Sequence, residues 1–244
     1  MKRLAPALLT LAVFAWPVHA DTIHVAADPW PPFVDEDHSE EGVSIEILKA
    51  AYATQGYDVE WTELPWARAM DGVIDGDYDV LPAVWHTDSR EENLKFSEPY
   101  LTNEVRFVQR TGGDFQYDGL DSLEGMTIGT IRDYGYSDEF NEADHFTRDE
   151  VSDFITNVRK LVDGRIDLTL EDEIVARAHI AANEPDLIDE VEFVDPPFST
   201  ADLYVVAGYG NDRHDEIIEA FNKGLEEIKA DGTFDQIMQD NELQ

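Results

Sequence analysis

One arginine of this sequence lies where it could bind a carboxylate. Arg90 ends the run TDSR at residues 87–90, on a predicted loop that follows a predicted strand. Its guanidinium offers a planar set of N–H donors that matches the two oxygens of a carboxylate. A surface arginine paired with one of the many nearby acids is the plainer interpretation, and for this segment alone it is the better one.

An aspartate at the end of another short strand could bind an ammonium group. Residues 164–173 have the sequence GRIDLTLEDE, in which a glycine ends a helix and Asp172 lies at the carboxyl end of the strand that follows. Aspartate is a common N-cap, so capping of the helix expected from Ile174 is the plainer role. If its carboxylate faces a crevice instead, it could accept hydrogen bonds from an ammonium group.

Other kinds of chemistry have little support in the sequence. The chain has no cysteine, which excludes disulfides, thiolate metal sites and cysteine nucleophiles. Its seven histidines lack the spacing of a helical zinc site, and no Ser-His-Asp signature or Gly-rich phosphate loop is present. Adjacent acids carry almost no information in a chain with 54 of them. We therefore expect no metal and no cofactor.

The elements that must position Arg90 and Asp172 alternate between strand and helix. Hydrophobic periodicity predicts strands over residues 23–27, 57–64 and 78–84, with helices over 43–56 and from Pro65. The same order recurs in a strand over 127–131, a helical stripe over 151–161, a strand over 166–170 and a helix over 174–182. Repeated βαβ units predict an α/β fold with open, largely parallel sheets that are flanked by helices.

Two extended segments, residues 102–110 and 201–209, bracket the second run of these units. The block between them has about the right size for a small domain. We predict one lobe from residues 21–108 and 203–244, a second lobe from residues 109–202, and a hinge where the chain crosses twice. Ligands bind in crevices between such lobes, outside the carboxyl ends of the strands.

The first twenty residues have the features of a secretory signal peptide. A positive start, MKR, precedes a mostly apolar run over residues 4–16 and small residues before Asp21. No later segment has the roughly 18 uninterrupted apolar residues of a membrane span. We expect residues 1–20 to be cleaved and the mature protein to be periplasmic and soluble.

The charge of the chain excludes one class of partner. Its 17 Lys and Arg against 54 Asp and Glu give a net charge of −37, which repels nucleic acid. A hydrophobic content of 43% indicates a packed core rather than disorder. We interpret the acidity as a halophilic adaptation, because a Debye length of about 3 Å at 1 M salt screens the self-repulsion.

That interpretation makes a prediction. The melting temperature is expected to rise along a salt series from dilute buffer to molar sodium chloride, because screening relieves repulsion among surface carboxylates. A protein that is most stable in dilute buffer would rule the interpretation out.

Four segments give the chain a resemblance to the bacterial extracellular solute-binding proteins, family 3, which serve ABC transporters for polar amino acids. They are WPPF at 30–33, residues 87–100, residues 164–173 and DGTFD at 231–235, and the resemblance covers essentially the whole mature sequence. It implies the two-lobed, type II periplasmic-binding-protein fold with a two-strand hinge. It also implies a monomer that closes around a small zwitterion, catalyses nothing and delivers the ligand to a membrane permease. By the same resemblance, Arg90 in the first lobe holds the ligand carboxylate and Asp172 in the second holds its ammonium.

Aromatic residues are also implicated by the resemblance. It places Trp30 and Trp66 on either side of the ligand. Each has a plainer interpretation as well. Trp30 could pack a polyproline-like loop on the core, and Trp66 could lie on the buried face of its own helix.

Two departures from the family pattern lie close to these positions. Trp85 replaces a small hydroxyl residue, and RDYGY at 132–136 replaces a glycine-threonine pair at a helix start. Tyr134 or Tyr136 could supply the missing donors, through hydroxyl groups or backbone amides. Alternatively, Trp85 and the tyrosines could form a cage for a methylated ammonium or a compatible solute, so that the ligand would be an analogue such as a betaine or an ectoine. Simple packing of the two lobes is the third interpretation.

Two rival functions are compatible with the same scaffold. Cyclohexadienyl dehydratases resemble this family and would need a carboxylic acid with a raised pKa beside Arg90 as general acid. A sensory module, whose closure is detected by another protein, is the second rival.

Overall fold

The computed structural model describes residues 21–35, 41–241 and 243. The predicted signal peptide, residues 1–20, lies outside the described residues. Within the described part of the chain, no helix is both long enough and apolar enough to cross a membrane.

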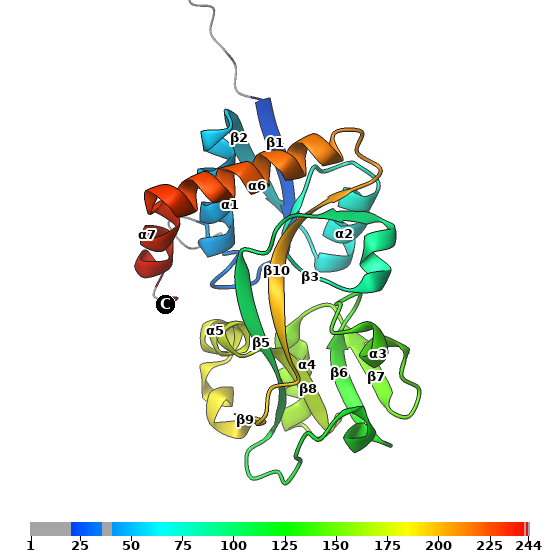
Figure 1. Ribbon diagram of the computed structural model, residues 1–244. Helices are drawn as coiled ribbons and strands as arrows, with labels where there is room; N and C mark the ends of the chain where they lie inside the picture. The colour runs from blue at the N-terminus through cyan, green and yellow to red at the C-terminus, as the bar shows by residue number, and fades with distance from the viewer. Residues whose placement is uncertain (1–20, 36–40, 242, 244) are drawn as a thin grey trace, which may run out of the picture.

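Two lobes are joined by two long strands, as Figure 1 shows. These strands are β5 (Leu101–Arg110) and β10 (Ser199–Gly208), and they pair antiparallel, with Leu203 opposite Leu101 and Ser199 opposite Val105. Both segments predicted to cross between the lobes are therefore strands, and the two-lobed α/β fold with a two-strand hinge is confirmed. The predicted lobe limits, 108/109 and 202/203, fall within β5 and β10, and that division stays a prediction.

The upper lobe in Figure 1 contains the start and the end of the chain. Its strands are β1 (Asp21–Ala27), β2 (Tyr57–Glu63), β3 (Leu81–Trp85) and β4 (Leu94–Phe96). Strands β1 and β2 pair in parallel, while β3 and β4 pair antiparallel with β10. Its helices are α1 (Val43–Thr54), α2 (Trp66–Ile74), α6 (His214–Asp231) and α7 (Thr233–Asp240), with a 3-10 helix η1 at Asp88–Glu92.

The lower lobe repeats this plan. Its strands are β6 (Thr127–Ile131), β7 (Thr147–Val151), β8 (Leu168–Asp172) and β9 (Val191–Phe193). Strand β6 pairs in parallel with both β7 and β8, while β8 and β9 pair antiparallel with β5. The helices are α3 (Asp138–Glu142), α4 (Phe154–Val162) and α5 (Glu173–Asn183), with 3-10 turns η2 at Leu120–Leu123 and η3 at Pro185–Glu190.

The structure corrects three details of the predicted elements. The third strand begins at Leu81 rather than at residue 78. The helical stripe expected from Val151 begins only at Phe154, because Asp153 caps it by accepting from the Thr156 N–H, and Val151 ends β7. The sheets are parallel within each lobe, but every pair that includes β5 or β10 is antiparallel, since these strands cross between the lobes.

The carboxyl ends of four strands bring polar residues toward the junction of the lobes. Asp28 follows β1, Trp85 ends β3, a loop at 132–137 follows β6, and Glu171 and Asp172 end β8. Open α/β sheets bind ligands at this edge. The fold therefore places most of the predicted site residues on facing edges of the two lobes.

Candidate ligand-binding site

A small cavity of about 20 Å³ lies between the lobes, with room for about one water molecule. We call it the inner box. Most of its lining comes from lobe 1, the upper lobe in Figure 1, and lobe 2, the lower lobe, contributes Tyr134 and Gly135. The lining residues are Ala27, Asp28, Trp30, Val34, Trp66, Pro82, Ala83, Trp85, Arg90, Tyr134 and Gly135.

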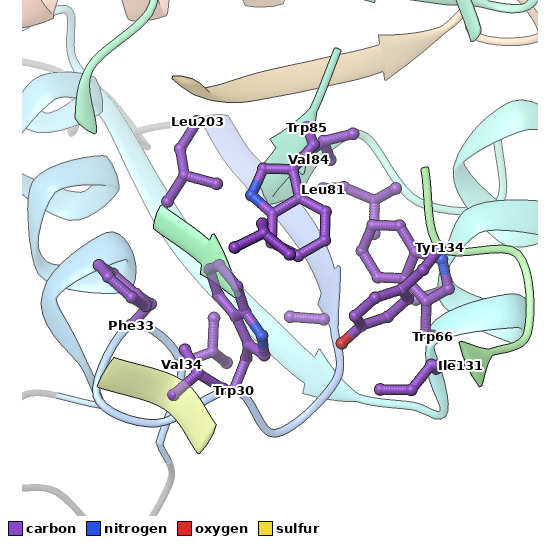
Figure 2. Close-up of a cluster of buried hydrophobic side chains, with 14 of the residues drawn as sticks. Trp30, Phe33, Val34, Trp66, Leu81, Val84, Trp85, Ile131, Tyr134 and Leu203 are labelled. Atoms are coloured by element: carbon purple, nitrogen blue, oxygen red, sulfur yellow. The ribbon is translucent and has the colours of Figure 1, made fainter. Parts of the chain in front are cut away.

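Four aromatic rings form the walls of the inner box. Trp30 and Trp85 pack edge to face with ring centroids 5.7 Å apart, and Tyr134 packs edge to face on both Trp85, at 5.6 Å, and Trp66, at 5.3 Å. Figure 2 shows these rings converging from both lobes. Edge-to-face pairs of this kind stabilise a packed interface. The structure thus brings together four of the five predicted aromatic residues, and they pack the lobes together as well as line a cavity.

The predicted arginine lies in this wall. Arg90 donates from Nη1 to the carbonyl of Trp85, at 2.7 Å, and from Nη2 to the carbonyl of Asp133 in lobe 2, at 2.8 Å. Its guanidinium also lies over the ring of Trp66, 5.3 Å from the centroid. Burial lowers the pKa of Arg90 to about 10, so the side chain remains a cation at neutral pH.

The loop after β6 is shaped to meet lobe 1. Asp133 has a φ of 62°, in the left-handed region that non-glycine residues rarely adopt, and its carbonyl accepts from both Arg90 Nη2 and Trp66 Nε1, the latter at 2.9 Å. A Cβ on Gly135 would lie 2.6 Å from Cζ of Arg90, so any larger residue would force the guanidinium to shift from its hydrogen bonds to Trp85 and Asp133. The RDYGY segment is therefore a closure loop rather than a helix start, since α3 begins only at Asp138.

Two carboxyl groups that the sequence analysis did not single out lie beside the box. Tyr134 donates its hydroxyl to Oδ2 of Asp28, at 3.3 Å. Burial raises the pKa of Asp28 to about 7, and the charge of Glu63 acts in the same direction. Trp30 donates its indole N–H to Oε1 of Glu171, at 3.4 Å.

Glu171 is fully buried, and Oε2 has no hydrogen-bond partner among the described residues. Burial raises its pKa well above the usual range, and the charges of Asp172 and Asp28 add to that shift. One sequence signal could have found it. Ile166, Leu168 and Leu170 alternate on one face of the strand, so a glutamate at 171 lies on the other face, at the strand end that meets the first lobe.

Asp172 has the plainer of its two predicted roles. Its side chain accepts from the Val175 N–H, at 2.9 Å, and caps α5, and it is 1% exposed. It does not line the inner box. Its role as partner of a ligand ammonium stays a prediction, and Glu171, one residue earlier, is the acid that reaches Trp30.

Tyr136 is the fifth predicted aromatic residue, and it lies behind the box. Its hydroxyl accepts from the Ile131 N–H, at 3.0 Å, and its ring packs against those of Trp85 and Tyr134. It lines a separate hollow in lobe 2 together with Arg148 and Glu150. Tyr136 therefore supports the box wall from outside.

A larger space adjoins the inner box. This outer cleft has a volume of about 780 Å³ and shares Asp28 and Tyr134 with the box. Its walls come from both lobes, and a space of this size is typical of small-molecule sites. Among the described residues, no group of three or more His, Asp or Glu could hold a metal ion.

Comparison with known proteins places this geometry in a family. The bacterial extracellular solute-binding proteins, family 3, match residues 23–241, and the chain belongs to that family. It is similar to a probable histidine-binding protein of Campylobacter jejuni, at 26% identity over 91% of this chain and 86% of that protein. It is also similar to a putative ABC transporter arginine-binding protein 2 of Escherichia coli K12, at 24% identity over 97% of each.

Solved structures agree on the fold. An ancestral arginine-binding protein bound to arginine is 27% identical, with a TM-score of 0.75 over 90% of this chain and 97% of that one. The GluR0 ligand-binding core from Nostoc punctiforme, at 20% identity and a TM-score of 0.73, shares the fold. The predicted type II periplasmic-binding-protein fold is confirmed.

The fit of Gly135 against Arg90 gives a prediction about stability. Gly135→Ala is expected to lower the free energy of unfolding by about 1–3 kcal/mol, because the new methyl group overlaps the guanidinium. Chemical denaturation measures this. Arg90→Ala removes the overlapping atoms, so the same glycine substitution should cost much less in that background. An equal cost in both backgrounds would contradict the arrangement.

The raised pKa of Asp28 gives a prediction about pH. Between about pH 4 and 7 the folded protein holds a proton on Asp28 that the unfolded chain has lost, so this residue makes stability fall as pH rises, by at most about 4 kcal/mol. Asp28→Asn should therefore gain stability relative to wild type from pH 4 to pH 8, measured by denaturation at each pH. Glu226→Gln, on the exposed side of α6, is the matched control. Parallel wild-type and Asp28→Asn profiles would refute the assignment.

Proposed function

We propose that this protein binds a small amino acid or close analogue with a cationic group in the space between its lobes, closes around it, and delivers it to the permease of an ABC transporter. The observation that carries the proposal is the pair Asp28 and Glu171, one acid from each lobe, beside an aromatic box that also contains Arg90. In this proposal the protein works in the periplasm as a monomer and catalyses no reaction.

Family membership and the relatives support this choice of ligand. Similar proteins are named for histidine and arginine, and the ancestral protein of 27% identity was solved with arginine bound. Both amino acids combine a carboxylate with an α-ammonium group, and arginine adds a cationic side chain. The site has the complementary charges, since Arg90 suits the carboxylate and the two acids suit the cations.

Closure follows from where these groups lie. A ligand that touches groups of both lobes gains most of its contacts only in the closed state, which shifts the population toward closure. A micromolar dissociation constant corresponds to about −8 kcal/mol, which two desolvated charge pairs and a filled pocket can supply. Betaines and ectoines remain within the proposal as analogues, because an aromatic cage attracts organic cations, such as the methylated ammonium of a betaine and the amidinium of an ectoine.

A ligand screen with an arginine variant tests the proposal. Arginine, lysine, histidine, betaines and ectoines should raise the melting temperature of the wild type in high salt if they bind. Arg90→Ala should abolish amino acid binding in calorimetry, since the ligand carboxylate would be left unpaired in a closed cleft. Arg165→Ala, at an exposed position of lobe 2, is the control. Wild-type affinity in Arg90→Ala would contradict the role of the arginine.

A second candidate function is a dehydratase on the same scaffold. It is favoured by the raised pKa of Asp28 and Glu171, because a general acid must hold a proton near neutral pH. Absorbance changes on adding prephenate or arogenate would reveal such an activity, and unchanged spectra would remove this candidate.

A further inference from the structure

Two hydrogen bonds cross between the lobes in opposite directions at the inner box. Trp30 of lobe 1 donates to Glu171 of lobe 2, at 3.4 Å, and Tyr134 of lobe 2 donates to Asp28 of lobe 1, at 3.3 Å. Figure 2 shows the indole nitrogen of Trp30 and the hydroxyl of Tyr134 pointing into the same space. Asp28 lines the inner box, whereas Glu171 is buried against Trp30 outside its lining, and the two acids, one from each lobe, lie near enough for the charge of Asp28 to act on Glu171.

This carboxyl pair is incompletely satisfied. Oε2 of Glu171 is fully buried and has no hydrogen-bond partner within the described part of the chain, and both crossing bonds are long. Leaving a buried oxygen unpaired costs free energy. An ammonium group placed between the two carboxyl groups would supply both the missing donors and the missing positive charge.

The positive charge nearest to the pair is already engaged. Arg90 is the cationic residue in the wall of the inner box, and its Nη1 and Nη2 donate to the carbonyls of Trp85 and Asp133. The Asp133 carbonyl takes the place that a ligand carboxylate would occupy on Nη2. A ligand without a carboxylate would therefore leave Arg90 hydrogen-bonded.

Size decides which part of a ligand enters the box. Its volume of about 20 Å³ suits a water-sized group such as a terminal ammonium, whereas the outer cleft of about 780 Å³ can take a chain. The two spaces meet at Asp28 and Tyr134. A ligand that fills both is elongated, with its cationic end in the inner box.

The outer cleft suits a chain with a second cation. Prolines, Phe154 and Ile155 offer apolar contact, and Asp35, Glu63 and Asp153 contribute carboxylates. Among its described lining residues there is no lysine or arginine. Burial lowers the pKa of His179, which also lines the cleft, so it adds no positive charge at neutral pH.

We propose that the cleft binds elongated aliphatic amines, with one terminal ammonium between Asp28 and Glu171, the methylene chain and a second ammonium in the outer cleft, and no required carboxylate. The inference rests on the proposed function, since it uses the same cleft and the same closure. It goes beyond it by naming Glu171 as the ammonium partner in lobe 2, and by extending the ligand class from amino acids to diamines and polyamines.

Calorimetry on the mature protein in 1 M sodium chloride tests this. The salt screens unspecific attraction of amines to a chain of net charge −37. The probes are 1,4-diaminobutane, spermidine, lysine, n-butylamine and glutamate. A diamine or spermidine should bind one to one, within about tenfold of lysine or tighter, and n-butylamine should bind at least about tenfold more weakly because it lacks the second cation.

Single substitutions test the contribution of each acid to diamine binding. Glu171→Gln and Asp28→Asn should each weaken diamine binding at least about tenfold, since each leaves the ammonium with one charged partner. Asp172→Asn should change it less than about threefold, because asparagine also caps a helix. Glu226→Gln, which removes an exposed carboxylate on α6, should change nothing.

Two outcomes overturn the inference without touching the proposed function. One is binding of lysine with no binding of any amine that lacks a carboxylate. The other is a tenfold loss in Asp172→Asn together with an unchanged Glu171→Gln. If no amine and no amino acid binds, the proposed function fails as well.

A second measurement keeps the test open if Glu171→Gln does not fold. At pH 6 a bound ammonium should expel on the order of one proton from the carboxyl pair, which appears as a binding enthalpy that depends on the ionisation enthalpy of the buffer. Asp28→Asn should reduce this proton release. Diamine binding to the wild type without proton release would refute a site between the two acids.

Discussion

The withdrawal of two carboxyl groups from water is the constraint on which the rest of the cleft depends. Asp28 and Glu171 come from different lobes; Glu171 is buried, Asp28 is half-buried, and each accepts a hydrogen bond from the opposite lobe. Burial raises the pKa of both acids. The charge of the ligand, the response to pH and closure of the lobes are therefore linked. In our proposal, a positive charge between Asp28 and Glu171 also holds the lobes together.

The aromatic rings make this desolvation possible. Trp30, Trp66, Trp85 and Tyr134 narrow the box to about the size of one water molecule, and three of them also form hydrogen bonds between the lobes: Trp30 to Glu171, Trp66 to the Asp133 carbonyl and Tyr134 to Asp28. A low-dielectric wall strengthens each of these bonds and also makes an unpaired charge more costly. Packing and ligand recognition are thus two consequences of the same rings.

Most of the fold and half of the site could be predicted from the sequence. Periodicity located most of the strands and helices, and the two crossing segments, because burial sets a regular spacing of apolar residues. Sequence motifs and the family resemblance pointed to Arg90 and the tryptophans. The sequence did not reveal Asp28 and Glu171, because their significance lies in contacts with Tyr134 and Trp30, 106 and 141 positions away, and acids are too common here for position to mark them. From the sequence, capping was favoured for Asp172 only because aspartate is a common N-cap. The hydrogen bond from the Val175 N–H in the structure shows the cap directly.

The hydrogen bonds between the lobes bear on which end of a ligand would contribute more to binding in our proposal. Arg90 and Trp66 both hold the Asp133 carbonyl, and Asp138 of lobe 2 accepts from Ser89 Oγ and from the Asp88 N–H of lobe 1. A carboxylate that displaced the Asp133 carbonyl from Arg90 would exchange one hydrogen bond for another, with a gain limited to its charge. A cation between Asp28 and Glu171, as we propose, would satisfy Oε2 of Glu171, which has no other partner among the described residues, and would interact with both lobes at once. Because a ligand shifts an equilibrium only by its differential affinity for the two states, a ligand bound as we propose would favour closure more through its ammonium end than through its carboxylate end.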